Sequence, residues 1–195
     1  MSEEGTRTLR PWYALMALGG GLGTVTAAWQ TVERIAWAAD PQAPSVCEIN
    51  TVLSCSSVYP HWQSSALGIP NSLIALPVFA FLLSAGLAGL LGGRLPRSYL
   101  GTVLGVTLLM TAFVTWYLAQ TALSIGALCL FCVGCGASIL VAGAGVTRVA
   151  SVTGVLGRGR LGHGASAMAT SGADVVAWIG LAGLIGLMLV LGLLL

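Results

Sequence analysis

Five long apolar segments separated by polar ones dominate the pattern of hydrophobic residues along this chain. The apolar segments cover residues 12–29, 70–91, 99–123, 125–149 and 175–195. A helix of about 20 apolar residues crosses the roughly 30 Å hydrocarbon core of a bilayer. The pattern therefore predicts an all-α integral membrane protein with five spanning helices. Glycines in the last three segments predict close packing between helices.

The polar segments between these helices differ in length and character. Residues 1–10 form a short tail, and residues 92–97 form a turn that contains Gly and Pro. Residues 150–172 form a Gly-rich, basic linker that we expect to be mobile. Residues 30–68 form the longest loop, rich in Pro, Ser and aromatic residues, and loops of that length are usually functional.

The composition supports the membrane assignment. Hydrophobic residues make up 56% of the 195 residues and charged residues only 7%. A soluble domain needs more polar groups than this to cover its surface. The formal net charge of +2 comes from scattered arginines, which argues against a nucleic-acid partner.

All eight basic residues are arginine, and their positions predict the topology. Seven lie in, or directly beside, alternate polar segments that the positive-inside rule assigns to the cytoplasm: Arg7, Arg10, Arg94, Arg97, Arg148, Arg158 and Arg160. Only Arg34 lies in the loop 30–68, which we therefore expect at the outer face of the cell membrane. The N-terminal tail and the linker are expected to be cytoplasmic. A cleaved signal peptide ending near residues 26–28 is an alternative, but Trp12 and Trp29 favour a retained helix with aromatic residues at both interfaces.

Two thiols, Cys129 and Cys132, lie at the start of the fourth apolar segment. Three residues apart on a helix, they share one face, and we expect Cys129 about one turn inside that helix. Unpaired N–H groups and the helix dipole would there lower the thiol pKa, which disulfide exchange exploits. The predicted topology places this pair on the same side of the membrane as the loop cysteines.

Cys47 and Cys55, eight residues apart in the loop, allow two interpretations. A structural disulfide between them would contribute about 2 to 3 kcal/mol. Alternatively they form a shuttle, in which one loop thiol attacks the Cys129–Cys132 disulfide while the other exchanges with an outside partner; two pairs on one face favour this. A zinc site made from the four thiols is a rival, but the sequence has no convincing His ligand. Cys135 is expected to act as a small hydrophobic residue.

These residues resemble the vitamin K epoxide reductase family, in particular its bacterial members. The matching motifs, within about residues 12–147, are Cys47-Glu-Ile-Asn-Thr-Val-Leu-Ser-Cys55-Ser, Gly68-Ile-Pro-Asn-Ser-Leu-Ile and Cys129-Leu-Phe-Cys132. The resemblance implies a catalytic four-helix bundle, residues 11–149, around a quinone that is ubiquinone or menaquinone, with residues 173–195 as a fifth transmembrane helix at its side. It also implies a separate thioredoxin-fold, DsbA-like partner at the outer face.

The same resemblance assigns roles to the thiols and to one amide. Cys132 would lie beside the quinone, and Cys129 would accept attack from a loop thiol. Cys55 would be that attacker, and Cys47 would contact the outside protein. Asn71 would donate a hydrogen bond to a quinone oxygen as that atom gains negative charge.

Three aromatic residues of the loop and one glycine complete the comparison. Tyr59, His61 and Trp62 either line the quinone pocket or anchor the loop at the membrane interface. Gly136 departs from the pattern, because animal relatives carry there a tyrosine that helps hold the quinone. Selectivity for an epoxide or for one class of quinone therefore stays open.

The predicted function is that of a quinone-dependent thiol-disulfide oxidoreductase of the membrane. Electrons would pass from the partner through Cys47 and Cys55, then Cys129 and Cys132, to the quinone, supporting disulfide formation in exported proteins. The alternatives are a vitamin K epoxide or quinone reductase, and a non-catalytic membrane subunit whose disulfides are structural.

Overall fold

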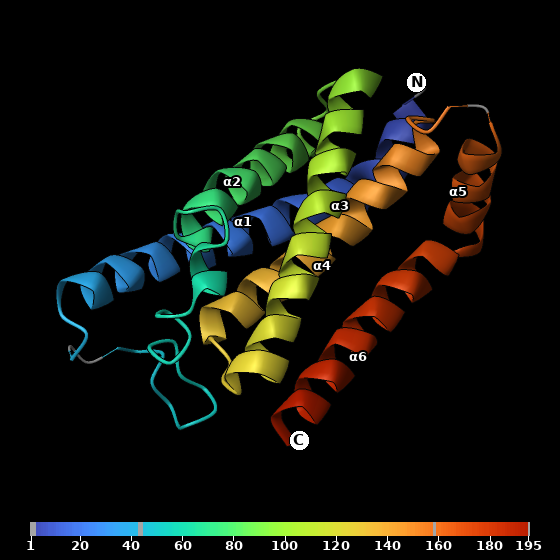
Figure 1. Ribbon diagram of the computed structural model, residues 1–195. Helices are drawn as coiled ribbons and strands as arrows, with labels where there is room; N and C mark the ends of the chain where they lie inside the picture. Colours follow the sequence, from blue (N-terminus) through green and yellow to red (C-terminus); the bar gives the residue numbers. More distant parts are fainter. Residues whose placement is uncertain (1–2, 43–44, 158, 195) are drawn as a thin grey trace.

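A computed structural model describes residues 3–42, 45–157 and 159–194 of the chain, and the described residues are helical apart from turns and one long loop. The helices are α1 (Glu3–Ala39), α2 (Asn71–Leu90), α3 (Arg97–Gln120), α4 (Leu130–Val152), α5 (Arg160–Ser171) and α6 (Ala173–Leu194) (Figure 1). A short 3-10 helix, η1 (Trp62–Ser65), lies in the loop, and a π-helical turn, η2 (Thr121–Ile125), extends α3. The prediction of an all-α protein is confirmed.

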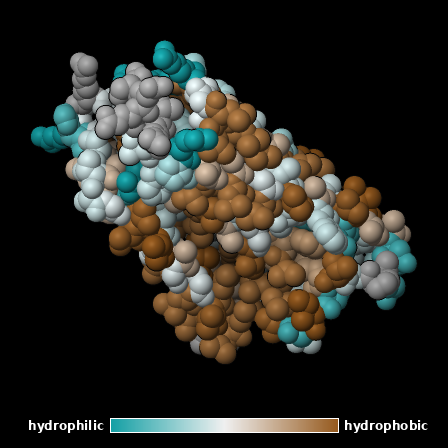
Figure 2. All heavy atoms as spheres, turned by 180° about the vertical axis from the view of Figure 1, so that it is seen from behind, coloured by the Kyte–Doolittle hydropathy of each residue, from teal (hydrophilic) through white to brown (hydrophobic). Residues whose placement is uncertain are grey.

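Within the residues that the structure describes, four helices are long and apolar enough to span a membrane. They cover Asn71–Leu90, Arg97–Ile125, Leu130–Val152 and Ala173–Leu194. The first predicted span, residues 12–29, forms the middle of α1, which is not among these four. Figure 2 shows hydrophobic side chains over most of the middle of one face, with hydrophilic residues gathered toward two ends. Large apolar side chains such as Leu109 and Leu184 lie on the surface, 73% and 67% exposed, as expected for a multi-pass membrane protein.

Helix α1 packs along both α2 and α4. Glycines permit this close approach: a Cβ atom at Gly20 would lie 2.4 Å from the backbone nitrogen of Leu83 in α2. On the other side, a Cβ atom at Gly19 would lie 2.5 Å from the backbone nitrogen of Ala142 in α4. The expected role of glycines in α3 and α6 is wrong at several positions, because a Cβ atom there meets nothing within 4 Å: Gly105, Gly180, Gly183 and Gly186.

The structure moves three boundaries that the sequence pattern predicted. Helix α1 begins at Glu3, within the predicted tail, and ends at Ala39, ten residues into the predicted loop. The long loop therefore covers residues 40–70, and we call it the cysteine loop. The linker expected to be mobile contains the helix α5. Helical hydrogen bonds continue past the apolar segment because membrane-spanning length does not limit helix length.

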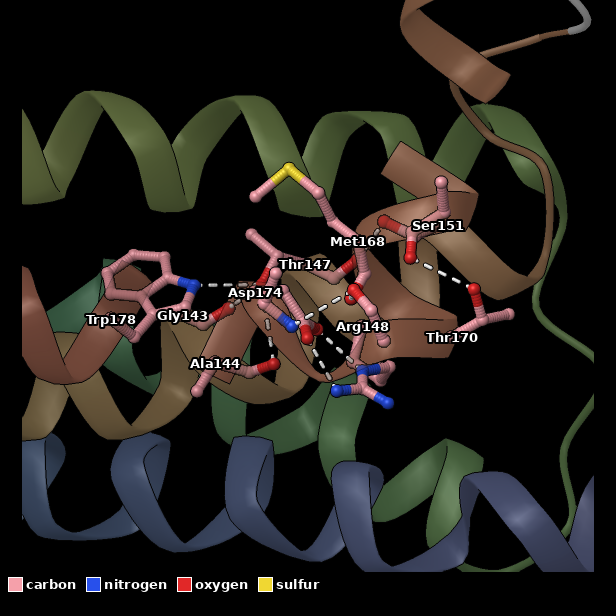
Figure 3. Close-up of polar contacts among 12 residues, drawn as sticks. Gly143, Ala144, Thr147, Arg148, Ser151, Met168, Thr170, Asp174 and Trp178 are labelled. Atoms are coloured by element: carbon pink, nitrogen blue, oxygen red, sulfur yellow. Dashed lines mark hydrogen bonds and ion pairs between the residues drawn. The ribbon is translucent and has the colours of Figure 1, made fainter. Parts of the chain in front are cut away.

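Helix α6 is attached to α4 by polar contacts between the two helices. The Arg148 guanidinium donates two hydrogen bonds of 2.5 Å to the Asp174 carboxylate, which begins α6. The Trp178 indole donates to the Thr147 hydroxyl at 2.9 Å, and Figure 3 shows both contacts bridging the helices. Arg148 also lies over the ring of Trp12, 4.3 Å from its centroid, so the same cation links α1, α4 and α6.

Candidate redox site

Backbone pairing holds the cysteine loop against the segment that precedes α4. The Leu128 N–H donates to the Val52 carbonyl at 2.7 Å, and the Ser54 N–H donates to the Leu128 carbonyl at 3.1 Å. Gly126, with φ of +72°, turns the chain from η2 into this pairing, a backbone conformation that glycine adopts without steric cost. The pairing brings Cys55 beside Cys129, although 73 residues separate them in the chain.

The two cysteine pairs meet in the interior. Cys47 and Cys55 form a disulfide, and Cys129 and Cys132 are free thiols. The sulfur of Cys55 lies 2.9 Å from the sulfur of Cys129, and all four cysteines are buried. The sulfurs of Cys47, Cys55 and Cys129 lie within 4.8 Å of one another, a spacing that suits a metal ion as well. In the disulfide form, however, only Cys129 of these three offers a thiolate ligand.

Cys129 lies at the N-cap of α4 rather than one turn inside the helix, because α4 begins at Leu130. The expectation of a lowered thiol pKa is wrong for this residue. Burial raises the pKa of the Cys129 thiol well above its ordinary value, and the neighbouring Cys132 raises it further, although the N–H groups of Cys132 and Phe131 lower it. Loss of water around the sulfur thus outweighs the helix terminus.

A closed polar cleft lies beside the thiols, between α1, α2, α3 and the cysteine loop. Its lining includes Gln30, Arg34, Tyr59, Ser64, Pro70, Asn71, Ser72 and Tyr117. The cavity has a volume of only about 10 Å³, so it is closed in this conformation. Within the described part of the chain, four buried side-chain atoms lack a hydrogen-bond partner, and three belong to this lining: Arg34 Nη1, Tyr59 Oη and Ser72 Oγ, with Gln63 Oε1 as the fourth. Unpaired buried polar atoms are costly, so their concentration here indicates a ligand site.

A comparison with known protein families identifies the family of this chain. The model of the vitamin K epoxide reductase family matches residues 14–147 of the chain. This chain belongs to the vitamin K epoxide reductase family. A search of curated proteins finds no match.

Asn71 and Tyr59, which were predicted to contact the quinone, both line the cleft. The Asn71 amide donates to the Gln63 carbonyl at 2.7 Å and accepts the Ala66 N–H at 3.2 Å, so it also fastens the loop to the start of α2. One amide hydrogen of Asn71 is left for a ligand. Burial raises the pKa of the Tyr59 phenol, which therefore stays a neutral donor.

His61 and Trp62, the other two predicted contacts, do not line the cleft. Both side chains are exposed, and Trp62 is 66% exposed. The Trp62 ring lies 6.0 Å from the ring of Trp116 on α3, on the outside of the bundle. This placement fits the interpretation of Trp62 as an anchor of the loop.

Three residues that line the cleft were not predicted from the sequence. The Gln30 amide lies 3.1 Å from the sulfur of Cys132, and Tyr117 Oη lies 3.9 Å from the same sulfur. Arg34 lies one turn beyond Gln30, with its guanidinium over the Tyr59 ring at 5.1 Å from the centroid. Gln30 and Arg34 were assigned to the loop, whereas they lie on α1. The isolation of Arg34 from the other arginines was the one signal in the sequence that pointed to it.

Proposed function

We propose that this protein is a membrane thiol oxidoreductase that takes electrons from a thioredoxin-fold partner and delivers them to ubiquinone or menaquinone. The partner, of the DsbA type, exchanges with Cys47 and Cys55 at the outer face of the cell membrane, with the N terminus in the cytoplasm. The product is an oxidised partner that introduces disulfides into exported proteins. The contact between the sulfurs of Cys55 and Cys129 is the observation on which this proposal depends.

The exchange between the two pairs conserves atoms and electrons. The Cys55 thiolate attacks the Cys129–Cys132 disulfide at Cys129, and the bond that breaks leaves its electron pair on Cys132. Cys47 then attacks Cys55, which closes the loop disulfide and releases Cys129 as a thiol. The arrangement in the structure, with an oxidised loop pair and a reduced CxxC pair, corresponds to the end of this exchange.

The cleft residues fit a quinone head group chemically. Arg34 Nη1 and the hydroxyls of Tyr59 and Ser72 are unpaired donors, and two carbonyl oxygens on a ring are suitable acceptors. A bound quinone would accept two electrons and two protons as the Cys129–Cys132 dithiol returns to a disulfide. Because the cleft is closed, entry of a ring requires movement of the cysteine loop or of neighbouring side chains.

The test is a Cys132→Ser variant of the purified protein, assayed with a reduced dithiol protein and a soluble quinone. The remaining Cys129 thiol should attack the loop disulfide at Cys55 and accumulate a Cys55–Cys129 disulfide on a non-reducing peptide map. Quinone reduction should fall to background. Cys135→Ala is the matched control, since it removes a buried thiol of the same helix and should keep normal activity. Normal quinone reduction by Cys132→Ser would refute the proposal.

Reduction of vitamin K epoxide is the second candidate function, and the position of Tyr117 supports it. A Cβ atom at Gly136 would lie 3.0 Å from Leu118 Cδ1, a tight contact that requires the Leu118 side chain to shift by a few tenths of an ångström. Tyr117 on α3 instead brings a phenol to the sulfur of Cys132. An assay with the epoxide and a dithiol separates the candidates: epoxide turnover that exceeds quinone turnover would favour the second.

A further inference from the structure

Gln30 is a buried amide whose position connects the two thiols of the CxxC pair. Its side-chain nitrogen lies 3.1 Å from the sulfur of Cys132 and 3.7 Å from the sulfur of Cys129. The residue is 8% exposed. An amide nitrogen carries two hydrogens and accepts none, so it is a donor toward both sulfurs.

Helix α1 presents Gln30 to the thiols because it continues unbroken to Ala39. One turn before Gln30, Ala27 is fully buried, and Thr26 lies against Gly134, whose Cβ position is 3.0 Å from the Thr26 methyl group. This close approach of α1 and α4 sets the distance between the amide and the sulfurs. A residue three or four positions away lies on the same helix face, which is why Arg34 faces the same cleft.

The surroundings of Cys132 contain few groups that stabilise a negative charge. The Tyr117 hydroxyl is 3.9 Å away, and the Arg34 guanidinium is held over the rings of Trp37 and Tyr59 at 4.7 and 5.1 Å. Cys132 is 4% exposed, so water does not solvate a charge on its sulfur. A thiolate in such a place depends on hydrogen bonds from the protein.

We propose that Gln30 is a catalytic residue that donates a hydrogen bond to the Cys132 sulfur as the Cys129–Cys132 bond opens. The inference rests on the proposed function, in which Cys55 attacks Cys129 and the electron pair of the broken bond remains on Cys132. Because the amide is nearer to Cys132 than to Cys129, it favours Cys132 as the leaving sulfur. Attack is thereby directed to Cys129, the sulfur that the cysteine loop reaches.

The test uses full-length Gln30→Leu, which keeps the approximate size of the side chain and removes the donor. In the reduced protein, the alkylation rate of Cys132 is followed against pH by peptide mass spectrometry. We expect the pH of half-maximal alkylation to rise by about one unit, equal to about 1.4 kcal/mol. Dithiol-dependent quinone turnover should fall about tenfold at an unchanged KM for the dithiol protein.

Two further variants separate catalysis from folding. Gln120→Leu makes the same substitution at the end of α3, where the side chain faces Ser124, and should match the wild type. Gln30→Glu keeps the shape of the amide but places a carboxylate beside the sulfur, so it should shift the alkylation profile at least as far as Gln30→Leu. If Gln30→Leu does not fold, the profile of Gln30→Glu decides.

An alkylation profile of Cys132 that stays at the wild-type pH in both Gln30 variants would overturn the role of this residue. Failure of the proposed function would give a different result, because the wild-type protein itself would then show no quinone reduction that depends on Cys129. The titration of Cys132 does not require quinone or a partner protein. The two failures are therefore distinguishable.

Discussion

Replacing Asp174 by asparagine should weaken the attachment of α6 to the bundle by about 3 kcal/mol. The Asp174 carboxylate accepts two hydrogen bonds from Arg148, and the two side chains are only 9% and 14% exposed. Breaking a buried ion pair by removing one charge costs about 3 to 5 kcal/mol, because the other charge stays buried without compensation. The lower value applies since Arg148 keeps its contact with Trp12 and asparagine still accepts one hydrogen bond.

Hydrogen exchange of the backbone amides of α6 measures this change directly. A loss of about 3 kcal/mol corresponds to roughly a hundredfold faster exchange in α6, with exchange in α2 unchanged. The double variant Arg148→Met with Asp174→Leu should recover most of the protection, since neither charge is then left unpaired. Arg97→Met is the control, because Arg97 is exposed and its guanidinium donates to a backbone carbonyl, that of Thr153 at 3.0 Å, rather than to a buried carboxylate. Wild-type protection of α6 in Asp174→Asn would refute the reasoning.

Three other changes test the packing, the loop and the cleft. Gly20→Ala forces a Cβ atom against the backbone of α2 and should lower the free energy of unfolding, measured by thermal unfolding, by about 1 to 3 kcal/mol. Gly183→Ala adds a Cβ atom with no neighbour within 4 Å and should leave the free energy of unfolding unchanged. Partial burial acts to raise the pKa of Glu48, but hydrogen bonds, above all from the Ser56 N–H, lower it below its ordinary value. The ionised Glu48 therefore stabilises the loop fully at pH values above the ordinary carboxylate pKa. This stabilisation is lost as the pH falls through the lowered pKa of the folded protein. Exchange of loop amides should then rise in acid, and Glu48→Gln should remove that dependence. Arg34→Met should slow quinone reduction at least tenfold while the Cys55–Cys129 exchange continues, a result that peptide mapping and a quinone assay check together; equal loss of both would contradict a role confined to the cleft.

Local properties of the chain were sufficient for much of the fold. Hydropathy over about 20 residues reflects transfer from water into hydrocarbon, so the membrane class and four of the five predicted spans follow without tertiary information. The spacing of Cys129 and Cys132 also marks them as a pair without tertiary information, because residues close in sequence stay close in space. The family motifs lie in these segments, and the family match covers them.

Contacts between distant segments were decided only by the tertiary structure. Pairing between Val52 and Leu128 determines that Cys55, rather than Cys47, lies against Cys129. The pKa of Cys129 is raised because packing removes water from the sulfur, which a helix-terminus argument does not include.

The cleft, too, depends on contacts between distant segments. Gln30 could not be recognised, and Arg34 was marked only by its isolation from the other arginines, because nothing in their own segment shows that α1 continues beyond its apolar part or which helices surround it. The sequence by itself determined what kind of residues meet a membrane and which thiols form pairs. Long-range packing determined which buried groups surround those thiols, since the free energy of a buried charge depends on all of its neighbours.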